Sequence, residues 1–117
     1  MNLLIVEDDQ ILSLMLRQMS HRLDLNVLAV VTTGEEAVET ALTTPCDLVF
    51  MDIRLEGKMD GIEACRQITQ VKPIPVIFIT GNTHLLRSSR ARECRYYASL
   101  DKPVVFEELQ NLVDSLR

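Results

Sequence analysis

The stretch Leu3-Leu4-Ile5-Val6-Glu7-Asp8-Asp9 places three consecutive carboxylates directly after an apolar run. A short run of large, mostly branched apolar residues bounded by charge is typical of a buried strand. Adjacent carboxylates repel one another, so a strand that ends in this way indicates that a positive group or a cation lies opposite. The stretch therefore predicts a strand whose carboxyl end carries a functional site.

Similar apolar runs recur along the chain, and segments with helical spacing separate them. The runs at residues 3–6, 27–31, 48–51, 76–79 and 96–100 predict five strands. Five helices are predicted near residues 10–23, around 37–42, around 62–68, at 83–93 and at 106–116. Thr33 and Glu36 have the spacing of a capping box for the second helix.

This alternation of strands and helices predicts a parallel sheet, because parallel neighbours need crossover connections. The runs are continuously apolar rather than alternating, as expected of strands that are covered on both faces. The predicted fold class is α/β, with a doubly wound five-stranded parallel sheet flanked by five helices. Repeats, low-complexity stretches and linkers are absent from the sequence, so residues 1–117 are expected to form one domain.

Composition narrows the class of protein. With 47% hydrophobic residues in 117, the chain is long and apolar enough to bury a core. Its formal net charge of -5 gives no reason to expect direct nucleic-acid or membrane binding. The odd count of cysteines, without metal-type spacing, predicts unpaired thiols in a reducing compartment, and we expect a cytoplasmic location. The cysteines are Cys46, Cys65 and Cys94.

Polar residues follow four of the predicted strands at the point where each strand ends. Each alone has an ordinary explanation, such as a helix cap or a turn, but four coincidences at one edge of a sheet favour a site. Carboxylates gathered there fit magnesium, and a carboxylate is itself a nucleophile toward phosphoryl groups. These residues are Glu7-Asp8-Asp9, Asp52, Thr80 and Lys102-Pro103.

The chain resembles the receiver domains of two-component response regulators, such as the chemotaxis regulators. The resemblance spans almost the whole chain and implies a flavodoxin-like strand order of 2-1-3-4-5. The motifs that carry it are Leu4-Ile5-Val6-Glu7-Asp8-Asp9, Met51-Asp52-Ile53-Arg54-Leu55, Asp60-Gly61-Ile62-Glu63, Ile79-Thr80-Gly81 and Lys102-Pro103.

This resemblance implies that Asp52 accepts a phosphoryl group from a phosphohistidine. The donor would be a sensor histidine kinase or a phosphotransfer protein. The cofactor would be Mg²⁺, with Asp8 and Asp52 as direct ligands, Glu7 acting through water and the backbone carbonyl of Arg54 completing the set. Asp9 falls outside this pair of acids and is better interpreted as the cap of the following helix.

Thr80 and Lys102 complete the implied catalytic set. Thr80 matches the hydroxyl that moves onto the phosphoryl group, and Lys102 matches the ammonium that pairs with it. The Lys102-Pro103 bond is expected to be cis. The domain would be no enzyme beyond catalysing its own phosphorylation and dephosphorylation.

The output side departs from the family pattern. Ser99 stands where the family usually has a switch aromatic, and Tyr97 lies on the same strand face. Glu56 replaces a common proline, and the residues after it lengthen the loop. Four arginines at 87, 90, 92 and 95 predict a surface for an effector domain or a homodimer, along the face between the fourth and fifth helices.

Three alternatives stay open. A phosphatase of the haloacid-dehalogenase type needs a second aspartate two residues after the first, where this chain has Arg54. A dinucleotide-binding domain needs a glycine-rich turn after the first strand, where this chain has acidic residues. A degenerate receiver that serves only as a protein-interaction module would lack part of the acid, threonine and lysine set, which is complete here.

Overall fold

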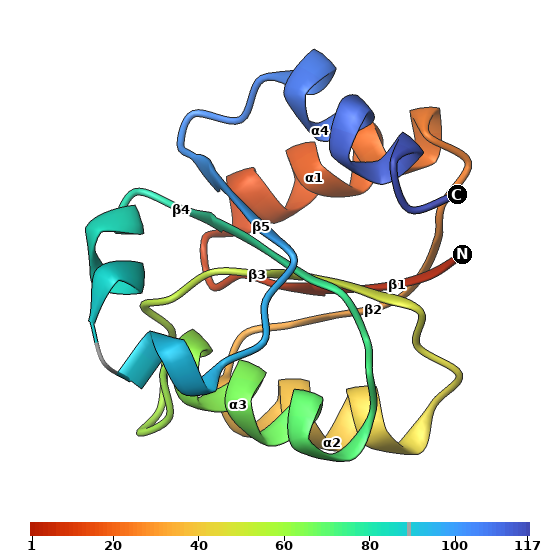
Figure 1. Ribbon diagram of the computed structural model, residues 1–117. Helices are drawn as coiled ribbons and strands as arrows, with labels where there is room; N and C mark the ends of the chain where they lie inside the picture. The colour runs from red at the N-terminus through yellow and green to blue at the C-terminus, as the bar shows by residue number, and fades with distance from the viewer. Residues whose placement is uncertain (89) are drawn as a thin grey trace.

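Five parallel strands form one sheet in the order β2-β1-β3-β4-β5 (Figure 1). The computed structural model describes residues 1–88 and 90–117. Each neighbouring pair of strands is parallel, which confirms the predicted α/β class and strand order. The strands are β1 (Asn2–Val6), β2 (Asn26–Val31), β3 (Leu48–Met51), β4 (Val76–Thr80) and β5 (Ala98–Asp101).

Helices cover both faces of this sheet. On one face lie α1 (Gln10–Arg22) and α4 (Phe106–Asp114), and on the other lie α2 (Gly34–Thr43) and α3 (Gly61–Val71) (Figure 1). Successive side chains of a strand point to opposite faces, so a strand between two layers must be apolar throughout. In β1, Leu3 and Ile5 pack with α1 and α4, while Leu4 and Val6 pack with α2 and α3.

Side-chain caps fix where three of the helices begin. Asp9 Oδ1 accepts hydrogen bonds from the backbone N–H groups of Ile11 and Leu12 at 2.9 and 3.0 Å, which confirms its predicted role as a cap. Thr33 Oγ1 accepts from the N–H of Glu36 at 3.1 Å, as the capping box predicts. Asp60 caps α3 in the same way. Each cap lies just beyond the carboxyl end of a strand or in the loop that follows it.

The predicted fourth helix at residues 83–93 is not an α-helix. Two short 3₁₀ helices take its place, η1 (Thr83–Arg87) and η2 (Arg90–Glu93), and Ser89 lies outside the described residues. Ser88 has an extended backbone, with φ -74° and ψ 160°, which ends η1. The segment also has too few apolar residues for a continuous helical stripe. Four α-helices, rather than five, therefore flank the sheet in the described part of the chain.

Two features beside β5 refine the sequence predictions. The strand begins at Ala98, two residues after the predicted start at residue 96. The Lys102-Pro103 peptide bond is cis, as expected. Within residues 1–88 and 90–117, every helix is too short or too polar to cross a membrane.

Cysteine pairing also differs from expectation. Cys65 in α3 and Cys94 after η2 form a disulfide with a Cα–Cα distance of 5.7 Å, while Cys46 is a buried free thiol. The prediction of unpaired thiols is therefore wrong for two of the three cysteines. The partners are 29 residues apart, and only the packing of η2 on α3 brings them together.

Candidate functional site

Three carboxylates meet at the carboxyl ends of β1 and β3. Val6 at the end of β1 lies opposite Met51 at the end of β3, so the residues that follow these strands must lie side by side. One oxygen each from Glu7, Asp8 and Asp52 lies within 4.8 Å of the others. Glu7 is 2% exposed and Asp52 is 6% exposed, so this is a pocket rather than a surface patch.

The ammonium of Lys102 enters this pocket from the loop after β5. Its Nζ donates a hydrogen bond to Asp52 Oδ2 at 2.7 Å and lies 2.9 Å from Glu7 Oε1. The other oxygen of Asp52, Oδ1, accepts a hydrogen bond from the N–H of Ile53 at 2.7 Å. Lys102 is thus the positive group that the acidic end of β1 predicts.

Burial and charge act against each other on these side chains. Burial raises the pKa of Glu7, and the nearby Asp52 charge adds to the rise, against the opposing effects of the Asp9 N–H group and Lys102. For Lys102, burial alone would lower the pKa, but hydrogen bonds to Asp52 and Glu7 outweigh it, and the pKa is raised. The two carboxylates therefore favour the charged form of Lys102, while burial makes the charge of Glu7 costly.

The remaining negative charge fits a divalent cation. Glu7 Oε1 is buried and has no aligned hydrogen-bond donor among residues 1–88 and 90–117, although the Lys102 ammonium is in contact with it. One ammonium does not balance three clustered carboxylates, and Mg²⁺ prefers oxygen ligands of this kind. Glu7, Asp8 and Asp52 would hold the ion. The side chain of Arg54 is exposed, and its backbone carbonyl as a further ligand stays a prediction.

Thr80 lies at the same edge, at the end of β4. It is fully buried, and its hydroxyl accepts a hydrogen bond from the N–H of Asn82 at 3.1 Å. Its carbonyl oxygen accepts from the backbone N–H of Lys102 at 3.2 Å, which joins the ends of β4 and β5. The hydroxyl is therefore engaged by its own loop, close in the chain to the start of η1.

Gly61 supports the pocket, a role that the sequence analysis did not assign. A Cβ at this position would lie 1.9 Å from the backbone oxygen of Asp52. The Gly61 N–H donates to the Ile53 carbonyl at 2.7 Å, so α3 begins in contact with the chain that carries Asp52. The signal in the sequence is the Asp60-Gly61 pair, a helix cap followed by the smallest residue.

The two tyrosines near β5 point in different directions. The Tyr97 side chain is exposed, and its hydroxyl makes a 2.6 Å hydrogen bond with Ser115 Oγ at the end of α4. Tyr96 instead packs edge to face against Phe78, with ring centroids 5.4 Å apart. Ser99 is exposed on β5. A switch role for Tyr97 stays a prediction.

Comparison with known proteins matches this architecture to one family. The family model described as the response regulator receiver domain matches residues 3–114. The N-terminal domain of a response regulator/sensory box/GGDEF protein from Carboxydothermus hydrogenoformans is 28% identical, with a TM-score of 0.88, over 98% of this chain and 92% of that one. The receiver domain of sensor histidine kinase PA1611 from Pseudomonas aeruginosa PAO1 is 28% identical, with a TM-score of 0.83, over 97% and 94% of the two chains. That structure is described as having a magnesium ion in its active site cleft.

Curated relatives are longer proteins. A protein-glutamate methylesterase/protein-glutamine glutaminase 1 from Syntrophus aciditrophicus is 33% identical over 106 residues, which are 87% of this chain and 30% of that protein. The transcriptional regulatory protein PdtaR from Mycobacterium tuberculosis is 30% identical over 106 residues, 91% of this chain and 51% of that protein. The chain thus spans about half or less of these relatives.

Proposed function

The chain belongs to the response regulator receiver domain family, and we propose that it is a phosphoacceptor whose acceptor residue is Asp52. The observation that carries this proposal is the contact of the Asp52 carboxylate with Lys102, inside a pocket formed with Glu7 and Asp8. A nucleophilic carboxylate, a fixed ammonium and a place for a hard cation are the parts that phosphoryl transfer needs.

In the proposed reaction an oxygen of Asp52 attacks the phosphorus of a phosphohistidine. The P–N bond breaks, its electron pair stays on the imidazole nitrogen, and an acyl phosphate forms on Asp52. Lys102 already lies at 2.7 Å from the carboxylate and would pair with the transferred phosphoryl oxygens. Bound Mg²⁺ would supply neutralisation of charge on those oxygens. Thr80 would exchange its bond with Asn82 for one with the phosphoryl group.

We expect the phosphodonor to be a sensor histidine kinase or a phosphotransfer protein. Relatives carry further regions, as the methylesterase and transcriptional regulator show by their length. An effector domain or a separate effector protein is therefore the expected receiver of the signal, and beyond its own phosphorylation the domain would catalyse no reaction.

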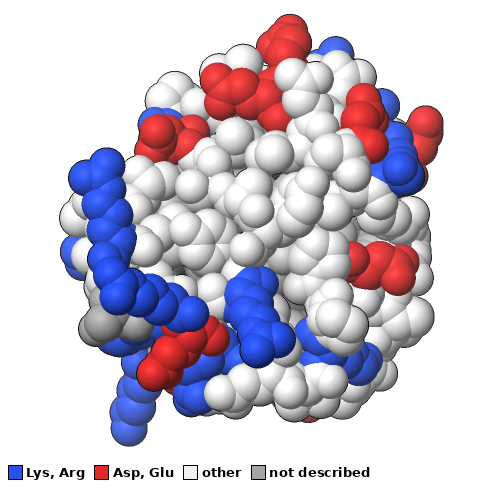
Figure 2. Space-filling model, viewed as in Figure 1, with Lys and Arg blue, Asp and Glu red and all other residues white. Residues whose placement is uncertain are grey.

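The surface beside Thr80 is the proposed output surface. Exposed arginines lie over η1, η2 and the start of the next loop, and exposed acids lie on α4. Figure 2 shows that Lys and Arg side chains gather toward the left and lower left of one face, and that several Asp and Glu side chains lie toward its top. Such a face suits a partner, or a second copy of the chain, with complementary charge. The residues are Arg87, Arg92, Arg95, Glu107, Glu108 and Asp114.

Intact mass measurement after incubation with Mg²⁺ and acetyl phosphate tests the acceptor. The expected result is a single phosphoryl adduct that is absent from Asp52→Asn, because the amide is nearly isosteric but is not a nucleophile. Asp9→Asn is the matched control, since an asparagine still caps α1 and Asp9 lies outside the cluster. An adduct that persists in Asp52→Asn would show that Asp52 is not the acceptor.

The same experiment separates the alternatives. A degenerate receiver that acts only as an interaction module would take no adduct in the presence of Mg²⁺. A phosphatase would release phosphate continuously from a large excess of acetyl phosphate, with turnover far faster than the decay of any adduct. A stable stoichiometric adduct that needs Mg²⁺ supports the receiver.

A further inference from the structure

The disulfide joins two elements of very different regularity. Cys65 lies in the middle of α3, faces the core and is fully buried, whereas Cys94 follows η2 and is 4% exposed. The η1 and η2 turns are held by short-range backbone bonds, including Ala91 N–H to the Ser88 carbonyl and Cys94 N–H to the Ala91 carbonyl. Short 3₁₀ turns have poorer hydrogen-bond geometry than an α-helix. The bond therefore connects a rigid anchor to a segment of low local stability.

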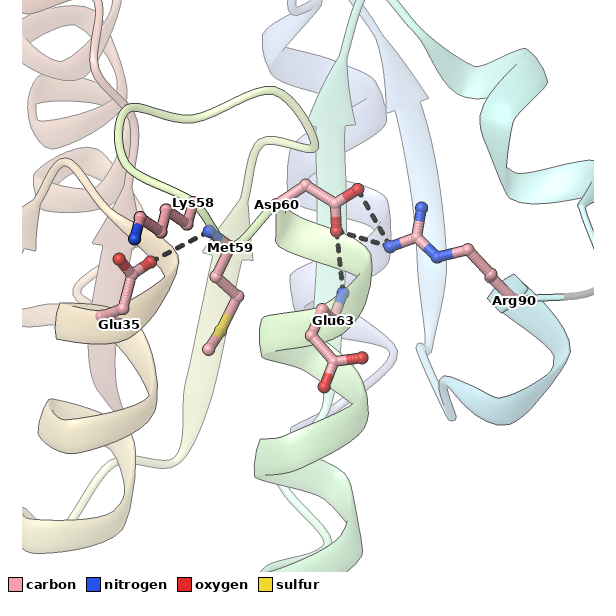
Figure 3. Close-up of a pocket in the computed structure, with 6 residues that line it drawn as sticks. All are labelled: Glu35, Lys58, Met59, Asp60, Glu63 and Arg90. Carbon is pink, nitrogen blue, oxygen red and sulfur yellow. Dashed lines mark hydrogen bonds and ion pairs between the residues drawn. The ribbon is translucent and has the colours of Figure 1, made fainter.

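A second, weaker link lies at the other end of η2. Arg90 reaches back to the helix cap Asp60 and donates to both of its carboxylate oxygens, at 2.8 and 2.9 Å (Figure 3). The Arg90 side chain is 56% exposed, so this ion pair adds little to stability. Between the two links Ala91 is buried against the core. The disulfide is consequently the stronger of these two links.

A groove lies beside the chain on either side of Cys94, although the Cys94 side chain does not line it. It has a volume of about 270 Å³, lies between α3 and the end of η2, and is lined by Thr69, Gln70, Glu93 and Arg95. The last two residues flank Cys94 in the chain. Because Cys94 is buried, η2 has to move outward before a thiolate in this groove can reach its sulfur.

We propose that Cys65 and Cys94 form a redox-controlled latch that holds η2 on α3 when oxidised and releases residues 83–88 and 90–96 when reduced. A thiolate of a dithiol reductant attacks Cys94 Sγ, which forms a mixed disulfide and releases Cys65 as a thiolate. The second thiol of the reductant then displaces Cys94. Two electrons and two protons end on the two cysteines, and the dithiol becomes a disulfide.

The segment held by the latch carries the arginines of the proposed output surface and follows Thr80 in the chain. It begins three residues after Thr80 and ends just before β5. The disulfide fixes the end of this segment that is distant from Thr80. Oxidation is therefore expected to reduce the movement of the segment when Thr80 bonds to the phosphoryl group. This consequence rests on the proposed function, whereas the latch itself does not.

Thiol counting tests whether the pair forms. The denatured full chain is alkylated and weighed after preparation without reductant, and again after dithiothreitol. We expect one reactive thiol before reduction, from Cys46, and three after it. Cys46→Ala is the matched control and should give none before reduction and two after it. Three reactive thiols in the unreduced wild type, after exposure to mild oxidant, would overturn the proposal.

Amide hydrogen exchange tests whether the pair is a latch. Reduction should speed exchange of the Ala91, Cys94 and Tyr96 amides by about tenfold or more, because their local opening no longer has to strain the cross-link. Amides within α3 should change little. Cys94→Ser should match the reduced wild type and should not respond to dithiothreitol, while Cys46→Ala should behave as the wild type does. Equal exchange of residues 90–96 in the oxidised and reduced proteins would contradict the latch.

Phosphorylation of the oxidised and reduced forms separates this inference from the proposed function. Both redox forms should take the phosphoryl adduct on Asp52, because neither cysteine lies in the acidic pocket. If neither form is phosphorylated but exchange still depends on reduction, the latch stands and the proposed function fails. If both are phosphorylated and exchange is unchanged by reduction, the latch fails alone.

Discussion

The acidic pocket after β1 and β3 and the segment after β4 lie at the same edge of the sheet, yet they are built differently. In the pocket, Glu7, Asp52 and Lys102 are held by strand ends whose neighbours are fixed by the sheet. The segment after β4 consists of two short 3₁₀ turns, η1 and η2. The Cys65–Cys94 disulfide links the end of η2 to α3, while η1 is linked to β5 by a hydrogen bond from Thr83 to Asp101. The difference indicates that the chemistry is rigidly placed, while the region beside it is free to respond.

Gly61 and Gly81 give the sharpest test of that difference. Gly61→Ala should destabilise the fold by roughly 3 kcal/mol or more, because the new Cβ would overlap the Asp52 carbonyl and α3 would have to move. Gly81 lies between β4 and η1, where an added Cβ meets no atom within 4 Å, so Gly81→Ala should change stability by about 0.5 kcal/mol or less. Chemical denaturation of both variants checks this. A loss in Gly61→Ala as small as that in Gly81→Ala would show that α3 relieves the overlap at little cost, and would contradict the rigid placement of the pocket.

Asp8 tests the metal side of the pocket. Asp8→Ala should weaken Mg²⁺ binding by about tenfold or more, since a ligand and a negative charge are both removed. The metal-free variant should remain folded and be at least as stable, because repulsion among the clustered acids falls. Calorimetric titration with Mg²⁺ measures the change, with Asp9→Asn as control. An affinity equal to that of the wild type would contradict the assignment of Asp8.

The contrast between the regions also explains what the sequence predicts well. Glu7 and Asp52 each follow an apolar run directly, and Lys102 follows the weaker fifth run and Asp101. The topology of a parallel sheet then brings the three side chains together. The cap at Asp9 is equally local. The weak apolar pattern of residues 83–93 is the sequence signal against a regular fourth helix. The Cys65–Cys94 bond depends on contact between distant segments, which neither spacing nor periodicity contains.

Arg54 tests how long the phosphoryl group persists. It lies two residues after Asp52 with an exposed side chain, and our hypothesis is that its cation shields the acyl phosphate from water. Arg54→Ala should then shorten the half-life of the adduct by a few fold, an effect of about 1 kcal/mol on the barrier. Lys58→Ala, in the same loop, is the control. A half-life that is unchanged or longer in Arg54→Ala would refute the shielding.

Glu63 should give the smallest effect. Hydrogen bonds from Arg66 and Gln67 lower its pKa to about 2, from an ordinary value of 4.5. Because the pKa of Glu63 is lower in the folded state than in the unfolded state, ionised Glu63 stabilises the folded state above the unfolded pKa. This contribution is present at neutral pH and is lost as the pH falls from 4.5 toward 2. Because the side chains are partly exposed, Glu63→Gln should lose only about 0.5 kcal/mol at pH 7.

Unfolding curves at pH 7 and pH 3 measure this contribution. The difference between wild type and Glu63→Gln should shrink at the lower pH. Glu39→Gln on the exposed side of α2 serves as control. A difference that grows as the pH falls would contradict the direction of the Glu63 pKa shift.

Backbone amide chemical shifts test most directly whether a phosphoryl group on Asp52 changes the conformation of the segment after β4 through Thr80. Spectra are compared with and without Mg²⁺ and a phosphoryl mimic such as beryllium fluoride, in the wild type, Thr80→Ser and Thr80→Ala. We predict changes across residues 84–99 in the wild type and in Thr80→Ser, which keeps the hydroxyl, and their loss in Thr80→Ala. Changes confined to the surroundings of Asp52, with residues 84–99 unaffected in the wild type under reducing conditions, would contradict the coupling.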